Sequence, residues 1–109
     1  MFKVIADPTF TNTVKVMVPV DGGHKPETLK ATYRVVDSDE TSRFDLVSPE
    51  GTTDFLRAII VRLDDLADEN GILIDYSDEV RDAVLGKPYA RIALAQGYFD
   101  AVSKARQGN

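Results

Sequence analysis

The hydrophobic pattern of this 109-residue chain changes its period once, near residue 37. Before that point apolar and polar residues alternate, which is typical of β-strands with one buried face. Valines at every second position predict a strand over residues 11–18, and Pro19 helps to end it because proline cannot donate a ladder hydrogen bond. A second alternating run predicts a strand over residues 28–36, and the glycine-containing residues 21–26 predict the turn between the two strands.

An isolated two-stranded hairpin is marginally stable in water. We therefore expect the apolar face of this hairpin to pack on helices. Residues 2–5 are apolar enough to offer a short third strand.

After residue 37, apolar residues recur every three or four positions, as on the buried face of an amphipathic helix. Ser38 or Asp39 can cap a first helix, which the pattern predicts over residues 39–47. Residues 48–51, with the sequence Ser-Pro-Glu-Gly, are predicted to break that helix.

Thr52 or Thr53 can cap a second helix, which the pattern extends to about residue 69. Asn70 and Gly71 are expected to end it with a left-handed residue. A short extended connector, residues 72–74, should follow. The apolar positions of the second helix share one face: Phe55, Leu56, Ile59, Ile60, Leu63 and Leu66.

Two further helices are predicted near the end of the sequence. Ser77 can cap a short one that Gly86 ends, and Pro88 suits the first position of the other, where its missing N–H costs nothing. Apolar and small residues cover much of the final helix, so another helix could approach it closely, from within this chain or from a neighbour.

These elements predict one α+β domain over residues 1–109, a length sufficient for a single core. Residues 1–37 form its β-rich part and residues 38–109 its helical part. The predicted architecture is an N-terminal antiparallel β-hairpin, with three strands if residues 2–5 join it, packed on a C-terminal bundle of three to four helices.

Composition narrows the classes of function. The formal net charge of −5 argues against nucleic acid as a partner, since neutralising phosphates needs clustered Lys and Arg. The chain has no cysteine, which excludes disulfides and thiolate metal sites. It has no run of about 20 apolar residues, the length that a membrane span requires. We expect a soluble protein without a metal or another cofactor.

The acidic and histidine residues do not form a recognisable catalytic or metal-binding motif. If Gly71 is aligned with the sixth position of an EF-hand loop, Leu66 and Ser77 fall where the key oxygen ligands are needed. Pairs of carboxylates such as Asp64 with Asp68 lie on predicted polar faces, and the single histidine, His24, lies in the predicted turn. We therefore expect no catalytic residues and no enzymatic activity.

Aromatic residues of the final helix are the candidates for partner binding. Their helical spacing favours a place in the core, but Tyr98 and Phe99 are adjacent and project about 100° apart, so both cannot point into one narrow seam. One of these two rings, or Tyr89, is then available as an interface anchor. The predicted partner-binding residues are Tyr89, Tyr98, Phe99 and Val102.

The order and spacing of several segments carry a resemblance to a known family. They are the opening Pro8-Thr9-Phe10-Thr11 before a valine-rich strand, Leu29-Lys30-Ala31-Thr32-Tyr33, the helix with Phe55-Leu56 and Ile59-Ile60, Asp68-Glu69-Asn70-Gly71, Tyr76-Ser77-Asp78-Glu79-Val80, and the Pro88-Tyr89 helix with the chain end Ala105-Arg106-Gln107-Gly108-Asn109. With this order the chain resembles the tail assembly chaperones of long-tailed bacteriophages over almost its whole length. Leu63 departs from the pattern, because such proteins are expected to carry a tryptophan near that position.

The resemblance implies a non-enzymatic role in viral morphogenesis. Such a protein would bind the tape measure protein of the phage or prophage in the cytoplasm of the bacterial host and keep it soluble until tail tube subunits replace it. The implied partners are the tape measure protein, further copies of the chain as a homo-oligomer, and the tail tube protein. The protein would be absent from the mature virion, and the family often also has a longer, frameshifted product.

The alternative function is that of a structural virion protein, such as a tail terminator or a head–tail joining component. Those proteins are also small, α+β and oligomeric. The two functions predict opposite results for purified particles, since only the structural protein would remain in them.

Overall fold

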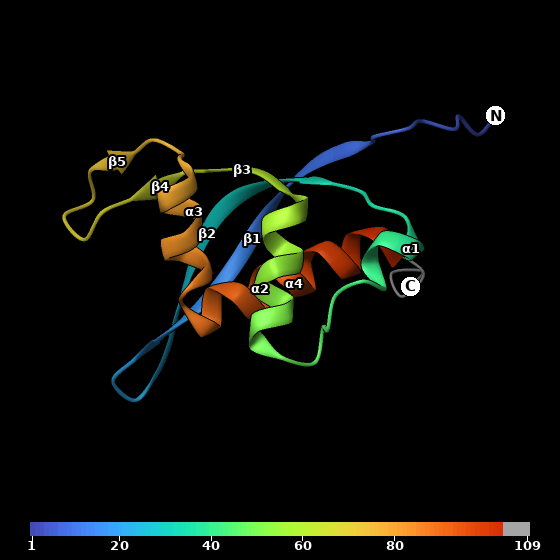
Figure 1. Cartoon of the computed structure of the whole chain (residues 1–109). Coiled ribbons are helices and arrows are strands. Elements are labelled where there is room, and N and C mark those ends of the chain that lie inside the picture. The colour runs from blue at the N-terminus through green and yellow to red at the C-terminus, as the bar shows by residue number, and fades with distance from the viewer. Residues whose placement is uncertain (104–109) are drawn as a thin grey trace.

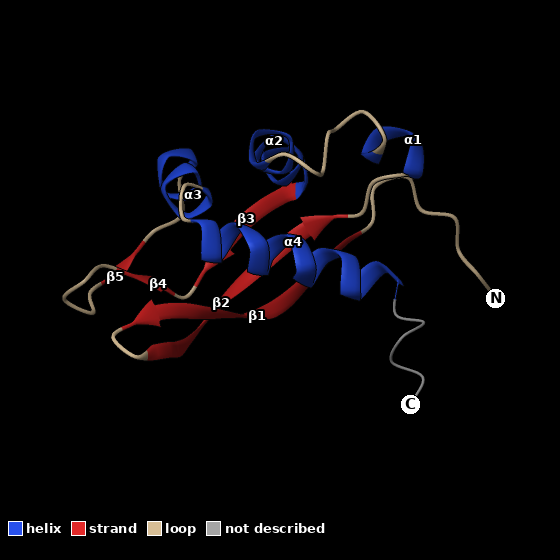
Figure 2. Ribbon diagram, turned by 90° about the horizontal axis from the view of Figure 1, so that it is seen from below, coloured by secondary structure: helices blue, strands red, loops and turns tan. Residues whose placement is uncertain are grey.

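The computed structural model describes residues 1–103 and has an α+β fold (Figures 1 and 2). Its elements in chain order are β1 (Thr9–Val20), β2 (Gly23–Arg34), α1 (Ser38–Thr41), α2 (Pro49–Ile59), β3 (Ile60–Asp64), β4 (Leu66–Ala67), β5 (Leu73–Ile74), α3 (Asp78–Leu85) and α4 (Pro88–Ser103). Strands β1, β2 and β3 form an antiparallel sheet in that order, and β4 pairs with β5. Figure 2 shows α2, α3 and α4 on one face of the larger sheet.

The predicted hairpin is confirmed, and its strands are longer than expected. Gly22 has a φ of 79°, so it supplies the left-handed conformation that the tight connection after Val20 requires. The prediction that Pro19 ends the first strand is wrong, because Pro19 lies inside β1, opposite His24. An edge strand tolerates proline wherever its N–H would not face the neighbouring strand.

The third strand of the sheet is β3 rather than residues 2–5. β3 pairs with β2 from Lys30↔Asp64 to Tyr33↔Ile60, whereas residues 2–5 belong to no strand of the described chain. The prediction of one helix to about residue 69 is therefore wrong, since α2 ends at Ile59. β-Branched residues from Ile59 to Val61 favour a strand over a helix. The buried Leu63 then lies on the core-facing side of β3.

The beginnings of the first two predicted helices also need correction. The first is reduced to the single turn α1, whose N-cap residue Asp37 makes no side-chain capping bond. Ser48 and Pro49 do not break a helix but begin α2: the backbone N–H of Gly51 donates to the Ser48 hydroxyl (3.0 Å), and Pro49 takes the first helical position. Neither of the predicted threonines is the cap.

Residues 65–74 form a small β-ribbon. Gly71 has a φ of 81°, so it adopts the predicted left-handed conformation. It lies in the turn between β4 and β5, however, and does not end a helix. The Asp68 carboxylate accepts from the backbone N–H groups of Asn70 (2.9 Å) and Ile72 (3.0 Å), which fixes this turn. The predicted extended connector is confirmed as the segment that contains β5.

The last two helices are confirmed. The Ser77 hydroxyl accepts from the Val80 backbone N–H at 3.1 Å and caps α3, which Gly86 follows. Pro88 is the first residue of α4. The chain end at residues 105–109, part of the family resemblance, lies outside the described residues.

The hydrophobic core lies between the sheet and the helices. Its largest fully buried side chains are Tyr33, Tyr98, Phe55, Leu56, Ile59, Leu63, Leu85 and Leu94. The hairpin contributes Val14, Val16, Leu29 and Ala31 to the same cluster. The helices therefore cover the apolar face of the sheet, which is the packing expected of a hairpin that is marginal alone.

Close packing at the start of α2 gives a testable prediction for Gly51. A Cβ atom there would overlap the backbone carbonyl of Asp45, so Gly51→Ala should lower the free energy of unfolding by about 1–3 kcal/mol. The control is Gly86→Ala, where a Cβ would meet backbone atoms only at 3.5 Å and φ is −70°, so its stability should match or exceed that of the parent. Urea denaturation of both variants measures the difference, and equal stabilities would contradict the packing described for Gly51.

Candidate functional site

Helix α4 packs its inner face against the sheet and the other helices. Ala90, Leu94 and Tyr98 on that face are buried, at the spacing of successive helical turns. Gly97 allows α4 to approach β1 closely, because a Cβ atom at this position would lie 3.4 Å from a methyl carbon of Val14. The position of α4 is therefore fixed by its contacts on two sides: the small Gly97 packs against β1, and the large side chains Leu94 and Tyr98 pack into the core.

The Tyr33 hydroxyl ties the sheet to α4. It donates to the backbone carbonyl of Leu94 at 2.8 Å, and the residue is fully buried. Burial raises the pKa of Tyr33 well above its usual value, since the phenolate would have to form away from water.

This raised pKa predicts a loss of stability at high pH. The Tyr33 contribution is fully present below the unfolded-state pKa of about 10 and is lost as pH rises above it, because only the unfolded chain then releases the proton readily. Tyr33→Phe should cost about 0.5–1.5 kcal/mol near pH 7 and should show a smaller further loss towards about pH 11 than the parent. Urea denaturation across this range tests it, and parallel pH profiles for parent and variant would contradict the assignment.

An aromatic cluster joins α4 to α2 and β2. The Tyr98 ring lies 5.5 Å from Tyr33 and 5.6 Å from Phe55, measured between ring centroids. Phe99 stacks on Phe55 at 5.6 Å with an interplanar angle of 8°. The Tyr98 hydroxyl also accepts from the backbone N–H of Val36 at 3.2 Å, so both ends of this side chain are held.

The four predicted partner-binding residues do not share one surface. Tyr98 is only 2% exposed and is part of the core. Phe99 is half-buried, and Val102 is 43% exposed. Tyr89 is half-buried at the beginning of α4, where it lines a different depression together with Met17.

Beside its buried face, α4 carries a row of half-buried and exposed apolar residues that we call the outer stripe: Ile92, Ala95, Phe99 and Val102. Ile92 is 60% exposed, although it is one of the larger apolar side chains of the helix. Leu46 and Val47 lie beside the stripe and line, with Ile92, Ala95 and Phe99, a depression of about 450 Å³. Ile92 and Ala95 were not among the predicted partner-binding residues, although their spacing of three and four positions to the next members of the stripe is visible in the sequence.

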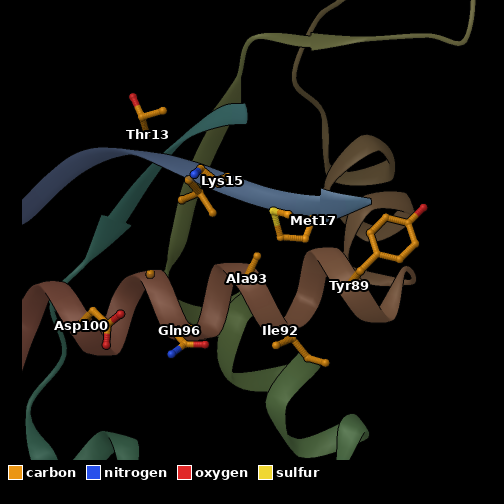
Figure 3. Close-up of a pocket in the computed structure, with 10 residues that line it drawn as sticks. Thr13, Lys15, Met17, Tyr89, Ile92, Ala93, Gln96 and Asp100 are labelled. Carbon is orange, nitrogen blue, oxygen red and sulfur yellow. The ribbon is translucent and has the colours of Figure 1, made fainter. Parts of the chain in front are cut away.

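A second depression, which we call the edge groove, runs between β1 and α4 (Figure 3). Its volume is about 470 Å³. Figure 3 shows Met17 of β1 and Ala93 of α4 pointing towards each other, with Tyr89 at one end of the groove and Asp100 at the other. A third depression, of about 320 Å³, lies between the hairpin, α3 and the β4–β5 ribbon.

Of the carboxylates considered for acid–base chemistry, Asp68 accepts from backbone N–H groups and Asp64 is paired with an arginine, as is the further carboxylate Asp82. Asp64 lies 2.8 Å from Arg62, whose hydrogen bond holds the pKa of the carboxyl below its usual range. Arg57 and Arg81 lower the pKa of Asp82 in the same way. A general acid needs a raised pKa, so these pairs have the opposite property. Within residues 1–103 no group of three or more His, Asp or Glu side chains could hold a metal ion.

The part of the chain that the structure describes contains no helix long and apolar enough to cross a membrane. The chain matches none of the family models, curated proteins or solved structures with which it was compared. The geometry described above gives the chain two candidate functional surfaces beside α4, the outer stripe and the edge groove.

Proposed function

We propose that the chain is a tail assembly chaperone of a long-tailed bacteriophage, a non-enzymatic protein that binds the tape measure protein and keeps it soluble during tail assembly. The proposal combines the order of segments in the sequence, which resembles that family, with the surface of α4, which suits a helical partner.

The observation that carries the binding role is that α4 is apolar on both sides. A helix at the surface of a domain normally has one apolar face, and a helix that is apolar all round is normally buried. The inner face of α4 is buried, yet Ile92 and Val102 on the outer stripe remain largely exposed. This imbalance favours a partner that covers the outer stripe.

The spacing of the outer stripe favours a helix as that partner. Its residues follow one another at intervals of three, four and three positions, which is the spacing of apolar residues along a coiled-coil seam. A partner helix that lies along the stripe would place its own apolar residues between these side chains. The neighbouring Leu46 and Val47 would widen the apolar contact on one side.

The length of the stripe explains how binding can be reversible. The ten helical steps from Ile92 to Val102 span about 15 Å, so a single copy contacts only a short part of a long partner. Weak contacts repeated by many copies along the tape measure helix would hold it through avidity, and tail tube subunits could then displace the copies one at a time. The net charge of −5 would help to keep such an assembly soluble in the host cytoplasm.

Co-purification and virion composition together test this function. The tagged chain should co-purify with the tape measure protein from cells that produce both, and purified mature virions should lack it. A tail terminator or head–tail joining protein would instead remain in the particles. Detection of the chain as a stoichiometric component of mature virions would therefore contradict the chaperone function.

A further inference from the structure

Strand β1 leaves one edge of the sheet open. It pairs with β2 on one side, and within residues 1–103 no strand pairs with its other side. An edge strand exposes a row of unpaired backbone N–H and C=O groups that can bind an additional strand.

The hydrogen-bonding pattern identifies the backbone groups on that open edge. Val35 donates to the carbonyl of Pro8 at 2.8 Å, which makes this the hydrogen-bonded type of antiparallel pair. Bonded and non-bonded pairs alternate, so β1 residues at even positions bond to β2. The hydroxyls of Thr11 and Thr32, 2.7 Å apart, fit the close approach of a non-bonded pair. The N–H groups of Thr13, Lys15 and Met17 therefore face outwards.

The open edge lies directly beside the edge groove. Thr13, Lys15 and Met17 line the groove on the β1 side, and Ile92 and Ala93 line it on the α4 side. A strand added to β1 would thus make backbone hydrogen bonds to the edge and place alternate side chains against α4, as in other cases of strand addition beside a helix. Met17 is 46% exposed, so its apolar side chain is available to such a strand.

The same chain carries an apolar segment without a place in the fold. Residues 1–6, which we call the arm, run away from the domain in Figure 1. Phe2 and Val4 are 89% and 92% exposed, and they would lie on the same face if the arm were extended. A short Phe-Lys-Val-Ile run of this kind favours a strand once a partner edge is present.

The arm cannot fill the edge groove of its own domain. The Asp7–Arg34 ion pair, at 3.8 Å, and the Pro8–Val35 hydrogen bond hold its base at the beginning of β1. If the arm turned back tightly, Phe2 would lie opposite residues 11–13, because antiparallel partners move away from the turn one residue at a time. It would then reach only the Thr13 end of the groove. Met17 is at least four residues, or about 13 Å, farther along the strand.

We propose that the arm of one copy adds as a strand to the open edge of β1 in a second copy, with Phe2 and Val4 in the edge groove. This contact is centred on the open edge of β1 and shares Ile92 with the outer stripe. It does not depend on the function proposed above. The contact has two halves: the arm of the giving copy, and the β1 edge with its groove in the receiving copy. A separate variant can disable each half.

The receiving half is tested with Lys15→Pro in the full chain. Proline at this position removes an outward N–H and leaves the ladder to β2 intact, as Pro19 already does at another odd position of β1. Its matched control is Lys15→Thr, which removes the same charged side chain but keeps the N–H. Sedimentation velocity should show that Lys15→Pro raises the dissociation constant of self-association about tenfold or more, while Lys15→Thr stays close to the parent.

The giving half is tested with the double variant Phe2→Asp and Val4→Asp, whose substitutions lie outside the core and should not change the unfolding temperature. This variant alone should not self-associate, but its mixture with the Lys15→Pro variant should form a complex, since each supplies the half that the other lacks. An arm variant that assembles like the parent would overturn the proposal, and it would instead indicate direct pairing of two β1 edges or another contact. A parent chain that stays monomeric up to millimolar concentration would overturn it as well.

Discussion

Tyr98→Ala should lower the free energy of unfolding by about 3–5 kcal/mol, among the largest effects expected from a single truncation in this domain. The side chain is 2% exposed, its ring contacts Tyr33, Phe55 and Phe99, and its hydroxyl accepts from the Val36 backbone N–H. Removing it would leave a cavity where β2, α2 and α4 meet, together with an unpaired N–H. Urea denaturation followed by circular dichroism measures the loss.

The control for this prediction is Tyr98→Phe, which keeps the ring and removes only the hydroxyl. It should cost about 1–3 kcal/mol, the expected penalty for an unpaired Val36 N–H. A loss below about 1 kcal/mol for Tyr98→Ala would contradict a core position for this ring. Tyr98→Asp is unsuitable as a test of partner binding, because a buried unpaired carboxylate would unfold the domain before any interface could be examined.

The second large effect should appear in partner binding. The double variant Ala95→Glu and Val102→Glu places two carboxylates on the outer stripe, where a bound helix would bury them. We expect its affinity for the tape measure protein to fall about 100-fold or more. The unfolding temperature should fall only moderately, because Val102 is 43% exposed and Ala95 is half-buried at the border of the core. Isothermal titration calorimetry with a soluble tape measure fragment measures the affinity.

A matched control separates loss of the apolar stripe from added negative charge. Ala67→Glu with Ala83→Glu introduces the same charge at exposed positions of β4 and α3, which do not line the depression beside the outer stripe. This variant should bind within about threefold of the parent. If both double variants bind equally well, or equally badly, the outer stripe is not the contact surface.

Local signals in the sequence were sufficient for the hairpin and for the last two helices. Period-two alternation, the glycine turn, the Ser77 cap and the Pro88 start each depend on a few neighbouring residues, and each occurs in the structure. The strand β3 could not be predicted in the same way. Ile59, Ile60 and Leu63 fit a helical stripe as well as a strand, and pairing with β2 decides between them across about 30 residues of chain.

The Ser48-Pro49 pair shows a different ambiguity. The same dipeptide can end one helix or begin the next, since proline is unfavourable inside a helix and favourable at its first position. Its role depends on whether residues 42–47 are helical, and in the structure α1 has ended at Thr41. The predicted end of the first helix and the predicted start of the second are therefore misplaced for the same reason.

The candidate surfaces were only partly predictable for a related reason. The sequence shows that Tyr98 and Phe99 point in different directions, but which ring faces the core depends on how α4 is rotated against the sheet. Close approach at Gly97, opposite Val14, and the Tyr33–Leu94 hydrogen bond fix that rotation. Once it is fixed, Tyr98 belongs to the core, and Ile92, Ala95, Phe99 and Val102 form the outer stripe.

The solubility of the tape measure protein on co-expression is the most direct test of the proposed function. The parent chain should move most of the tape measure protein from the insoluble to the soluble fraction. The Ala95→Glu and Val102→Glu variant should not, and the Ala67→Glu and Ala83→Glu control should behave like the parent. A soluble fraction that is the same with and without the parent chain would contradict the account.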